Sequence, residues 1–172
     1  MDLRMGRSNL NKMTLYELSQ RLGKLLQQRN LLLATAESCT GGYISQMITA
    51  VPDSSQWFER GFVTYSNEAK MEMLGVSADT LTEQGAVSSA VVMEMALGAL
   101  KHSHAHISVA VSGIAGPSGG SIAKPVGTVC FAIAGGDKGV QTYTQHFPGD
   151  RQAVREVAVE FALRQLYDYI SD

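Results

Sequence analysis

The sequence predicts an α/β protein, a single domain in which a three-layer mixed β-sheet is covered by helices. Apolar segments with strand character alternate with segments of helical periodicity, a pair of apolar stretches then suggests a hairpin, and an amphipathic helix ends the chain. The 172 residues, 45% of them hydrophobic, are enough for one core and require no second. We therefore expect one domain with a C-terminal hairpin and a final helix.

The first expected helix begins at a capping box. Thr14 and Glu17 are three residues apart, so each side chain can satisfy the backbone N–H of the other. A stripe of leucines follows, and the helix is expected to end near Asn30, before an apolar strand over residues 31–36. Residues 1–12 are polar with scattered charges, which predicts a flexible leader and a domain that covers residues 13–172.

The segment that joins this strand to the next helix is rich in small polar residues. Hydrophobic residues recur at helical spacing from Tyr43 to Ile48, so residues 38–42 must form the turn. The first N–H groups of a helix have no intrahelical partner and carry the positive end of its dipole. Gly41 and Gly42 would let a ligand approach the backbone. The turn therefore predicts a site for a phosphate, a carboxylate or an oxyanion.

The later elements are expected to alternate in the same way. Proline disfavours helical geometry in the residue before it, so the second helix should end around Val51–Pro52. The remaining expected ranges are a connector over 53–60, a strand over 61–65, a helix over 66–74, a turn-rich stretch over 76–87, a helix over 88–101, a strand over 107–111, a glycine-rich loop over 112–121, a hairpin of 126–134 with 140–147, and a helix from Asp150 to Ile170.

Composition and charge exclude several classes of function. A net charge of −2 without a basic cluster argues against binding along a nucleic acid. No apolar run approaches the ~20 residues that span a bilayer. Cys39 and Cys130 lie far apart, as in a reduced cytoplasmic protein. The alternating His102, His104 and His106 lack a nearby carboxylate or cysteine, so we expect surface residues and neither a metal nor a cofactor.

Three segments that follow expected strands carry reactive or backbone-rich residues: 38–42, 65–70 and 112–120. If the first three strands run parallel, these loops share one rim, where ligands of α/β sheets bind. The shared cleft would suit acyl transfer, with Ser38 as the nucleophile and Lys70 as its base if burial lowers the lysine pKa. Tyr65 would relay or orient, and Asn67 would orient the lysine or the substrate amide.

Each of these residues also has a plainer interpretation. A serine before a helix is usually a cap, and a lysine on a short helix usually extends into solvent. Tyr65 can be a half-buried packing residue. Cys39 is a rival nucleophile if the helix N-terminus favours its thiolate, although a buried structural cysteine is commoner.

Five segments resemble the signature segments of the CinA C-terminal family, in the family's order. They are Thr35 to Gly42, Gly61 to Lys70, Gly85 to Ser88, Ser112 to Pro117 and Lys124 to Val129, and the resemblance extends from about Thr14 to Tyr169. It implies hydrolysis of the carboxamide of nicotinamide mononucleotide to nicotinate mononucleotide and ammonia, in pyridine nucleotide (NAD) recycling. It also implies a serine, a lysine and a tyrosine at Ser38, Lys70 and Tyr65, and a homo-oligomer, a dimer or larger.

The implied mechanism assigns roles to the surrounding residues. Ser38 would attack the carboxamide carbon, and amides of Thr40 to Gly42 or of Ser112 to Gly116 would hold the oxyanion. The other glycine-rich loop would bind the 5′-phosphate, with Arg60 or Arg151 pairing its charge. Glu37 or Tyr65 would face the pyridinium ring. The expected substrate-binding residues are Glu37, Thr40, Gly41, Gly42, Asn67, Ser112, Gly113, Gly116, Arg60 and Arg151.

Two other functions remain open at this stage. The same loops could hold a phosphorylated ligand in a nucleotide-binding regulatory module that breaks no bond. A different amidase, acting on a related small amide, would use the same residues.

Overall fold

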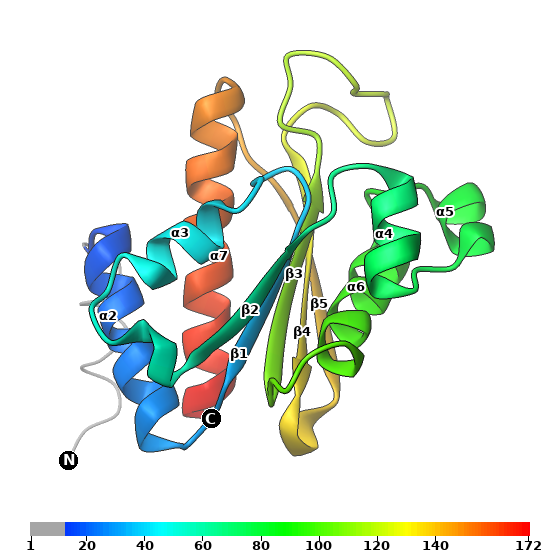
Figure 1. Cartoon of the computed structure of the whole chain (residues 1–172). Helices are drawn as coiled ribbons and strands as arrows, with labels where there is room; N and C mark the ends of the chain where they lie inside the picture. The colour runs from blue at the N-terminus through cyan, green and yellow to red at the C-terminus, as the bar shows by residue number, and fades with distance from the viewer. Residues whose placement is uncertain (1–12) are drawn as a thin grey trace.

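A five-stranded mixed sheet separates two layers of helices in the computed structural model, which describes residues 13–172 (Figure 1). The strand order is β2-β1-β3-β4-β5. Strand β1 (Leu33–Glu37) pairs in parallel with the edge strand β2 (Phe58–Val63) on one side and with β3 (Ile107–Gly113) on the other. The strands β4 (Thr128–Gly135) and β5 (Val140–His146) add an antiparallel hairpin to β3. The predicted mixed sheet and hairpin are therefore confirmed.

The helices cover the two faces of the sheet unequally. On one face lie α2 (Leu15–Gln28), α3 (Tyr43–Thr49) and the long α7 (Arg151–Ser171), and their apolar sides close the larger core. On the other face lie α4 (Asn67–Leu74), α5 (Ala78–Gln84) and α6 (Ser89–Lys101), over a core rich in alanine and valine. The structure thus has the predicted three layers.

The ends of the helices follow the local signals of the sequence. Thr14 caps α2, accepting the Glu17 N–H at 3.2 Å, while the Glu17 carboxylate accepts the Thr14 N–H at 2.8 Å. Ser66 caps α4 through the Ala69 N–H at 3.0 Å, and Gly75, at φ 69°, ends that helix. Because these contacts are local, the spacing of the residues alone was sufficient to predict them.

The structure differs from the prediction where tertiary contacts determine the presence or the bounds of an element. The stretch over 76–87 contains helix α5, which buries only Leu81 and so shows no apolar periodicity in the sequence. Strand β2 begins at Phe58 because the buried Trp57 packs against Gly23 of α2 and leads the chain to the sheet edge. Helix α3 ends at Thr49, just before the predicted boundary. The predicted leader over 1–12 lies outside the described residues.

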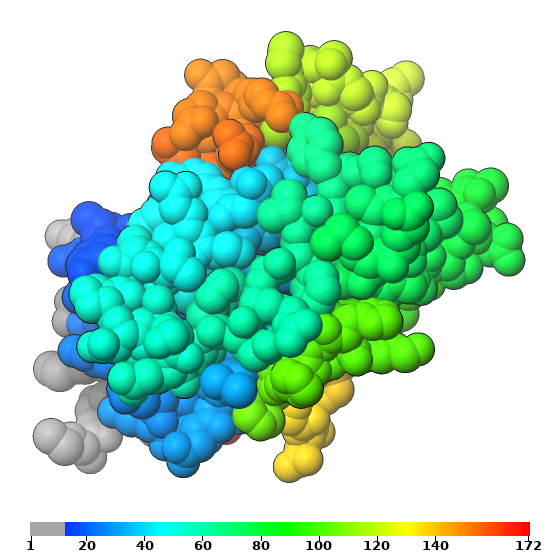
Figure 2. Space-filling view, in the orientation of Figure 1, coloured from blue at the N-terminus to red at the C-terminus, as the bar shows by residue number. Residues whose placement is uncertain are grey.

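The first three strands β1, β2 and β3 run parallel, which meets the condition stated from the sequence, and their carboxyl ends therefore lie at one rim. In the same view, the start of α7 and the loop after β3 rise as neighbouring projections at the top of the molecule (Figure 2). Arg151 Nη1 joins them by donating to the Gly116 carbonyl at 2.9 Å. Among residues 13–172, no helix is long and apolar enough to cross a membrane.

Candidate active site

A serine and a lysine meet at the base of this rim. Ser38 directly follows β1, where its N–H donates to the Val111 carbonyl at 3.0 Å, and Lys70 lies on α4. The Lys70 Nζ is 3.0 Å from the Ser38 Oγ, and the two residues are 1% and 8% exposed. The pair therefore has the separation that a base needs to take the proton of a hydroxyl nucleophile.

Two carbonyl groups orient the lysine amine. Nζ donates to the Thr64 carbonyl at 2.9 Å and to the Tyr65 carbonyl at 3.4 Å. A neutral amine has two N–H donors and one lone pair. The two carbonyls can take both donors, which leaves the lone pair for the hydroxyl proton of Ser38.

The surroundings of Lys70 favour that neutral form. Within residues 13–172, the ion pairs are Arg60–Glu59 and Arg164–Glu160, so no carboxylate is paired with Lys70. Burial lowers the pKa of Lys70 below its ordinary value of 10.5, because the ammonium form loses its hydration; the nearby Cys39 opposes this to a smaller extent. A lysine can act as the base for Ser38 only if burial lowers its pKa, and Lys70 meets this condition.

A pocket of about 190 Å³ opens above the serine–lysine pair. This volume is below the ~300 Å³ at which sites for whole drug-sized ligands begin, so the pocket suits the reacting end of a larger molecule. Its wall combines the three predicted loops with the start of α7 and the α5–α6 connection, and consists of Ser38, Cys39, Tyr65, Asn67, Lys70, Ala86, Val87, Ser112, Gly113, Ala115 and Arg151.

Glu37, one of the two residues expected at the substrate ring, does not line this pocket, whereas the other, Tyr65, does. The Glu37 side chain is fully buried, and Oε2 accepts hydrogen bonds from the Thr40 hydroxyl at 2.6 Å, the Gly42 N–H at 3.2 Å and the Ile44 N–H at 3.0 Å. Oε1 accepts the N–H and hydroxyl of Ser45. The carboxylate thus occupies the N-terminus of α3 from inside the protein. The Gly42 amide, which was expected to bind substrate, is engaged by Glu37, and so is the hydroxyl of Thr40, whose backbone amide was the group expected at the oxyanion.

We expect Glu37→Gln to lower the free energy of unfolding by about 2–4 kcal/mol, because its amide nitrogen would face backbone or hydroxyl donors in a buried site. Thr40→Val is the matched control, since it removes one of the five donors and should cost about 1 kcal/mol. Denaturant unfolding of both variants measures the difference. Equal stability of Glu37→Gln and the parent protein would contradict this structural role.

Two arginines of α7 hold the rim in place. Arg155 donates to the carbonyl of Cys39 at 3.2 Å and to that of Thr40 at 3.1 Å, which fixes the turn from the outside. Arg151 Nη2 lies 3.1 Å from the Tyr65 hydroxyl. Tyr65 is 62% exposed and contacts Lys70 through its carbonyl only, so its hydroxyl is directed to Arg151 and not to the serine–lysine pair expected from the sequence.

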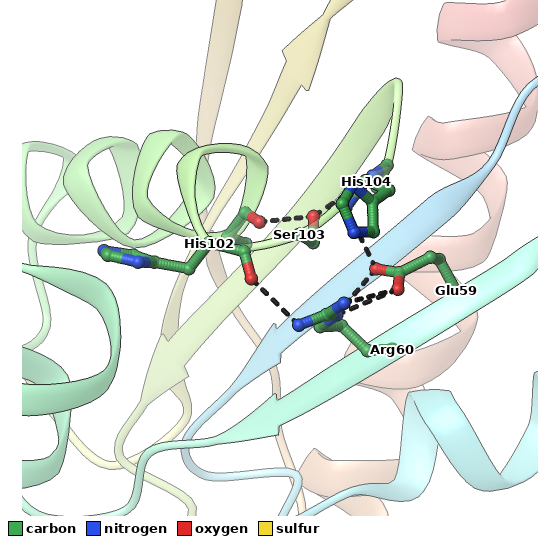
Figure 3. A network of polar contacts seen from close by, with 7 residues as sticks. Glu59, Arg60, His102, Ser103 and His104 are labelled. Atoms are coloured by element: carbon green, nitrogen blue, oxygen red, sulfur yellow. Dashed lines mark hydrogen bonds and ion pairs between the residues drawn. The ribbon is translucent and has the colours of Figure 1, made fainter.

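Arg60 lies away from the pocket, at the opposite end of the sheet. Figure 3 shows its guanidinium against Glu59 and the His102 carbonyl, beside His104. Arg60 is level with Ala34 on β1 and tethers the edge strand β2 to the connection between α6 and β3. The predicted phosphate role of Arg60 is therefore incompatible with its position.

The three histidines of that connection are exposed, as predicted. The Nδ1 atom of His106 accepts the Leu32 N–H at 2.9 Å, which is a structural contact. Nowhere in residues 13–172 do three or more His, Cys, Asp or Glu side chains form a group that could hold a metal ion.

Cys39 is a poor rival to Ser38 as a nucleophile. Burial raises the pKa of the Cys39 thiol to about 12, so the thiol remains protonated near neutral pH. Its sulfur packs beneath Gly113, where an added Cβ would lie 3.1 Å from Sγ and 2.8 Å from a Val129 methyl. This close packing explains a glycine at the end of β3.

The other predicted residues divide between the pocket and its support. Asn67, Ser112 and Gly113 line the pocket, and Asn67 is exposed at the start of α4. The Gly41 N–H donates to the Ser38 carbonyl at 3.0 Å, and the Gly116 carbonyl accepts from Arg151, so both residues shape the loops.

Arg155, Ala86 and Val87 also belong to the rim or the pocket wall, although none of them was expected there from the sequence. Arg155 follows Arg151 by one helical turn, so both side chains lie on the same face of the predicted final helix. Because Arg151 was already expected at the site, this spacing could have indicated Arg155 as well. Ala86 and Val87 come from the connection that follows the unpredicted helix α5.

The fold and the site define a class of protein: a three-layer α/β protein with a buried serine–lysine pair at the carboxyl end of its parallel strands. Residues 15–170 match the model of the CinA C-terminal domain. The chain belongs to this family, as the motifs in its sequence suggested.

Two named relatives and a solved structure show how close this relationship is. The nicotinamide-nucleotide amidohydrolase PncC of Escherichia coli K12 is 54% identical over 153 residues, which are 89% of this chain and 93% of the relative. The Pseudomonas putida protein of the same name is 52% identical over 85% of this chain and 91% of its own length. The crystal structure of the competence/damage inducible protein CihA from Agrobacterium tumefaciens superposes with a TM-score of 0.89 at 42% identity, covering 92% of this chain and 96% of that one.

Proposed function

We propose that this protein is a nicotinamide-nucleotide amidohydrolase, which hydrolyses the carboxamide of nicotinamide mononucleotide to nicotinate mononucleotide and ammonia. The observation that carries the proposal is the 3.0 Å contact between Ser38 Oγ and a buried lysine amine that forms no ion pair with any carboxylate of residues 13–172. The high identity to proteins named for this activity, over nearly their whole length, supports the choice of substrate. In this proposal the enzyme acts in the cytoplasm, in the recycling of pyridine nucleotides, as a single domain over residues 13–172.

Ser38 attacks the carboxamide carbon while Lys70 takes its hydroxyl proton, which gives a tetrahedral oxyanion. The protonated lysine then returns the proton to the leaving nitrogen, and ammonia departs from an acyl-enzyme. A water molecule, deprotonated by Lys70, attacks the ester carbon, and Ser38 leaves with the proton to complete the cycle. The carbonyls of Thr64 and Tyr65 keep the amine in line with Ser38 throughout.

The Gly113 N–H is the donor that we assign to the oxyanion. The N–H and carbonyl of Ile114 both bond to the β4 side, and strand geometry alternates, so the Gly113 N–H must face the opposite side, where β1 has ended. Ser38 and Gly113 both line the pocket. The amides of Gly41 and Gly42, which the sequence also suggested, already donate to Ser38 and Glu37.

Arg151 is the residue that we assign to the 5′-phosphate. It is exposed at the start of α7 and lines the pocket beside Tyr65, so a nucleotide with its carboxamide at Ser38 would direct its phosphate outward past the guanidinium. The exposed ring of Tyr65 provides a wall for the pyridinium and the ribose.

Arg151→Met is expected to raise KM for nicotinamide mononucleotide about 10- to 100-fold with little change in kcat, because a charge-assisted contact to the phosphate is lost. KM for nicotinamide riboside, which has no phosphate, should change far less. Arg164→Met on the same helix is the control, since Arg164 pairs with Glu160 away from the pocket. Steady-state kinetics with both substrates measures the effect, and an equal rise in KM for both would reject the assignment.

Ammonia release from nicotinamide mononucleotide by the purified protein tests the proposed function, with free nicotinamide as the control substrate. We expect ammonia from the nucleotide and little from the free base, with and without a chelator. Hydroxylamine should intercept the acyl-enzyme and yield the hydroxamate. Binding of the nucleotide without ammonia release would instead favour a nucleotide-binding regulatory module, and release from other small amides alone would indicate a different amidase.

A further inference from the structure

The active-site pocket has a buried amine at its base, and none of the described residues 13–172 contributes a carboxylate to its wall. The two basic residues that line it are Lys70 and Arg151, and Arg151 is directed to the rim by its contacts with Tyr65 and Gly116. The other lining residues are neutral. A positive charge that enters this pocket therefore meets a possible ammonium at Lys70 and no anion in the wall to offset it.

The charged groups on the elements around Lys70 do not change this balance. From β1, the Glu37 carboxylate is turned toward the start of α3 and accepts five hydrogen bonds. On α4 itself, Glu68 and Glu72 are exposed. From α6, Glu94 accepts the Ser77 N–H and the Thr80 hydroxyl. From α7, Arg151 and Arg155 add positive charge, while the Asp150 carboxylate accepts the Ala153 N–H and the Glu156 carboxylate accepts the Gln152 side-chain amide. In the turn after β1, the Cys39 thiol is neutral.

The proposed substrate brings a fixed positive charge to this place. Its ring nitrogen is alkylated by the ribose, so the pyridinium is cationic at every pH, whereas free nicotinamide is neutral. Nucleophilic attack requires the carboxamide carbon about 3–3.5 Å from Ser38 Oγ. Since that oxygen is 3.0 Å from Lys70 Nζ, the cationic ring and the amine must share one pocket of about 190 Å³.

We infer that a proton on Lys70 and the charge of an N-alkylpyridinium substrate exclude each other, so that the cationic substrate selects and maintains the neutral, basic form of Lys70. This inference rests on the proposed function and adds to it a basis for substrate selection. The substrate's own charge keeps the base ready, an effect that a neutral amide cannot provide.

Thermodynamic linkage makes the exclusion measurable in both directions. When the cation binds the protonated enzyme, the Lys70 ammonium loses its proton to solvent and becomes the amine, and charge is conserved. The affinity for the cation must then rise about tenfold per pH unit below the pKa of free Lys70 and level off above it. In turnover, kcat/KM should fall on the acidic side with the pKa of the free enzyme, while kcat falls only at a pH at least about one unit lower.

The direct test measures ligand binding to the Ser38→Ala protein between pH 5 and 10.5 by calorimetry. The two probes are nicotinamide mononucleotide and its reduced 1,4-dihydro form, which has a neutral ring and the same phosphate. The phosphate and Arg151 therefore contribute equally to both. We expect the affinity ratio of cationic to neutral ligand to rise with pH by at least about tenfold and then level off. Buffers of different ionisation enthalpy should report proton release for the cationic ligand only.

The double variant Ser38→Ala, Lys70→Met is the matched control, and its affinity ratio should not depend on pH. A constant ratio for Ser38→Ala over the whole range would overturn the inference. That result is distinguishable from failure of the proposed function, which is shown by the parent protein releasing no ammonia from nicotinamide mononucleotide. Ammonia release with a constant affinity ratio would leave the amidohydrolase standing and remove only the exclusion between proton and substrate charge.

Discussion

Replacing Ser38 by alanine is expected to lower kcat for ammonia release by at least about 10⁴-fold, because no acyl-enzyme can form without the hydroxyl. The side chain of Ser38 is 8% exposed. Its hydroxyl oxygen takes no part in the backbone hydrogen bonds of the turn or in the hydrogen bonds of Glu37. The variant should therefore fold and bind nicotinamide mononucleotide. Ammonia release and calorimetric binding, measured on one preparation, separate loss of chemistry from loss of structure.

Cys39→Ala is the matched control for this experiment. It removes the neighbouring thiol, whose pKa burial raises to about 12, and retains the backbone of the turn. We expect activity within about tenfold of the parent protein, because the thiol forms no bond in the proposed reaction. If Ser38→Ala retained turnover and Cys39→Ala lost it, the nucleophile would be the cysteine.

Lys70→Met is expected to reduce kcat by at least about 10³-fold, since Ser38 and its base act as one unit. Methionine keeps a long unbranched side chain in the space beside Ser38 but has no lone pair to accept its proton. Nucleotide binding should persist. Turnover close to that of the parent protein would show that the base lies elsewhere.

The same substitution should also reveal the cost of burying the amine. Burial lowers the pKa of Lys70 in the folded protein, so between that pKa and 10.5 the unfolded chain binds one more proton than the folded one. The stability of the parent protein should therefore rise with pH in this window, by up to about 1.4 kcal/mol per pH unit from this group. Lys70→Met should lack that contribution.

Thermal unfolding of both proteins from pH 6 to 10 measures this difference. The stability of Lys70→Met relative to the parent protein should be greatest at low pH and decline as pH rises. For a chain of 172 residues, the difference in Tm between the two proteins should change by up to about 3–5 °C per pH unit. Lys24→Met on α2 controls for the loss of one positive charge, and parallel curves for parent and Lys70→Met would contradict a lowered pKa.

Local and periodic features of the fold could be predicted from the sequence. The capping box at Thr14 and the glycine that ends α4 depend on residues three to eight positions apart, so their geometry is contained in the spacing. Helix α7 buries one face along its whole length, which produces an apolar stripe, and strand β1 is buried over all five of its residues after an apolar run that begins at Leu31. Helix α5 buries only Leu81, so its sequence has no apolar periodicity from which the helix could be predicted.

The sequence also placed Ser38 and Lys70 at strand ends of one sheet, because parallel strands carry the segments that follow them to the same rim. The orientation of Glu37, the residue before that serine, toward the ligand or toward the interior depends on contacts with residues outside its own strand. Glu37 is the last residue of a fully buried strand, and its carboxylate is turned toward α3 by donors that only the folded chain assembles.

The helix caps and the succession of helices and strands along the chain were thus determined by the sequence itself, since each depends on short-range spacing or on which face of an element is apolar. Tertiary structure alone decided that Lys70 lies 3.0 Å from Ser38 without a counter-charge, that Arg155 holds the turn from a helix more than a hundred residues away, and that Arg60 lies at the far end of the sheet. Charge, pKa and hydrogen bonding depend on distance and burial in three dimensions, and neither quantity is present in the order of residues.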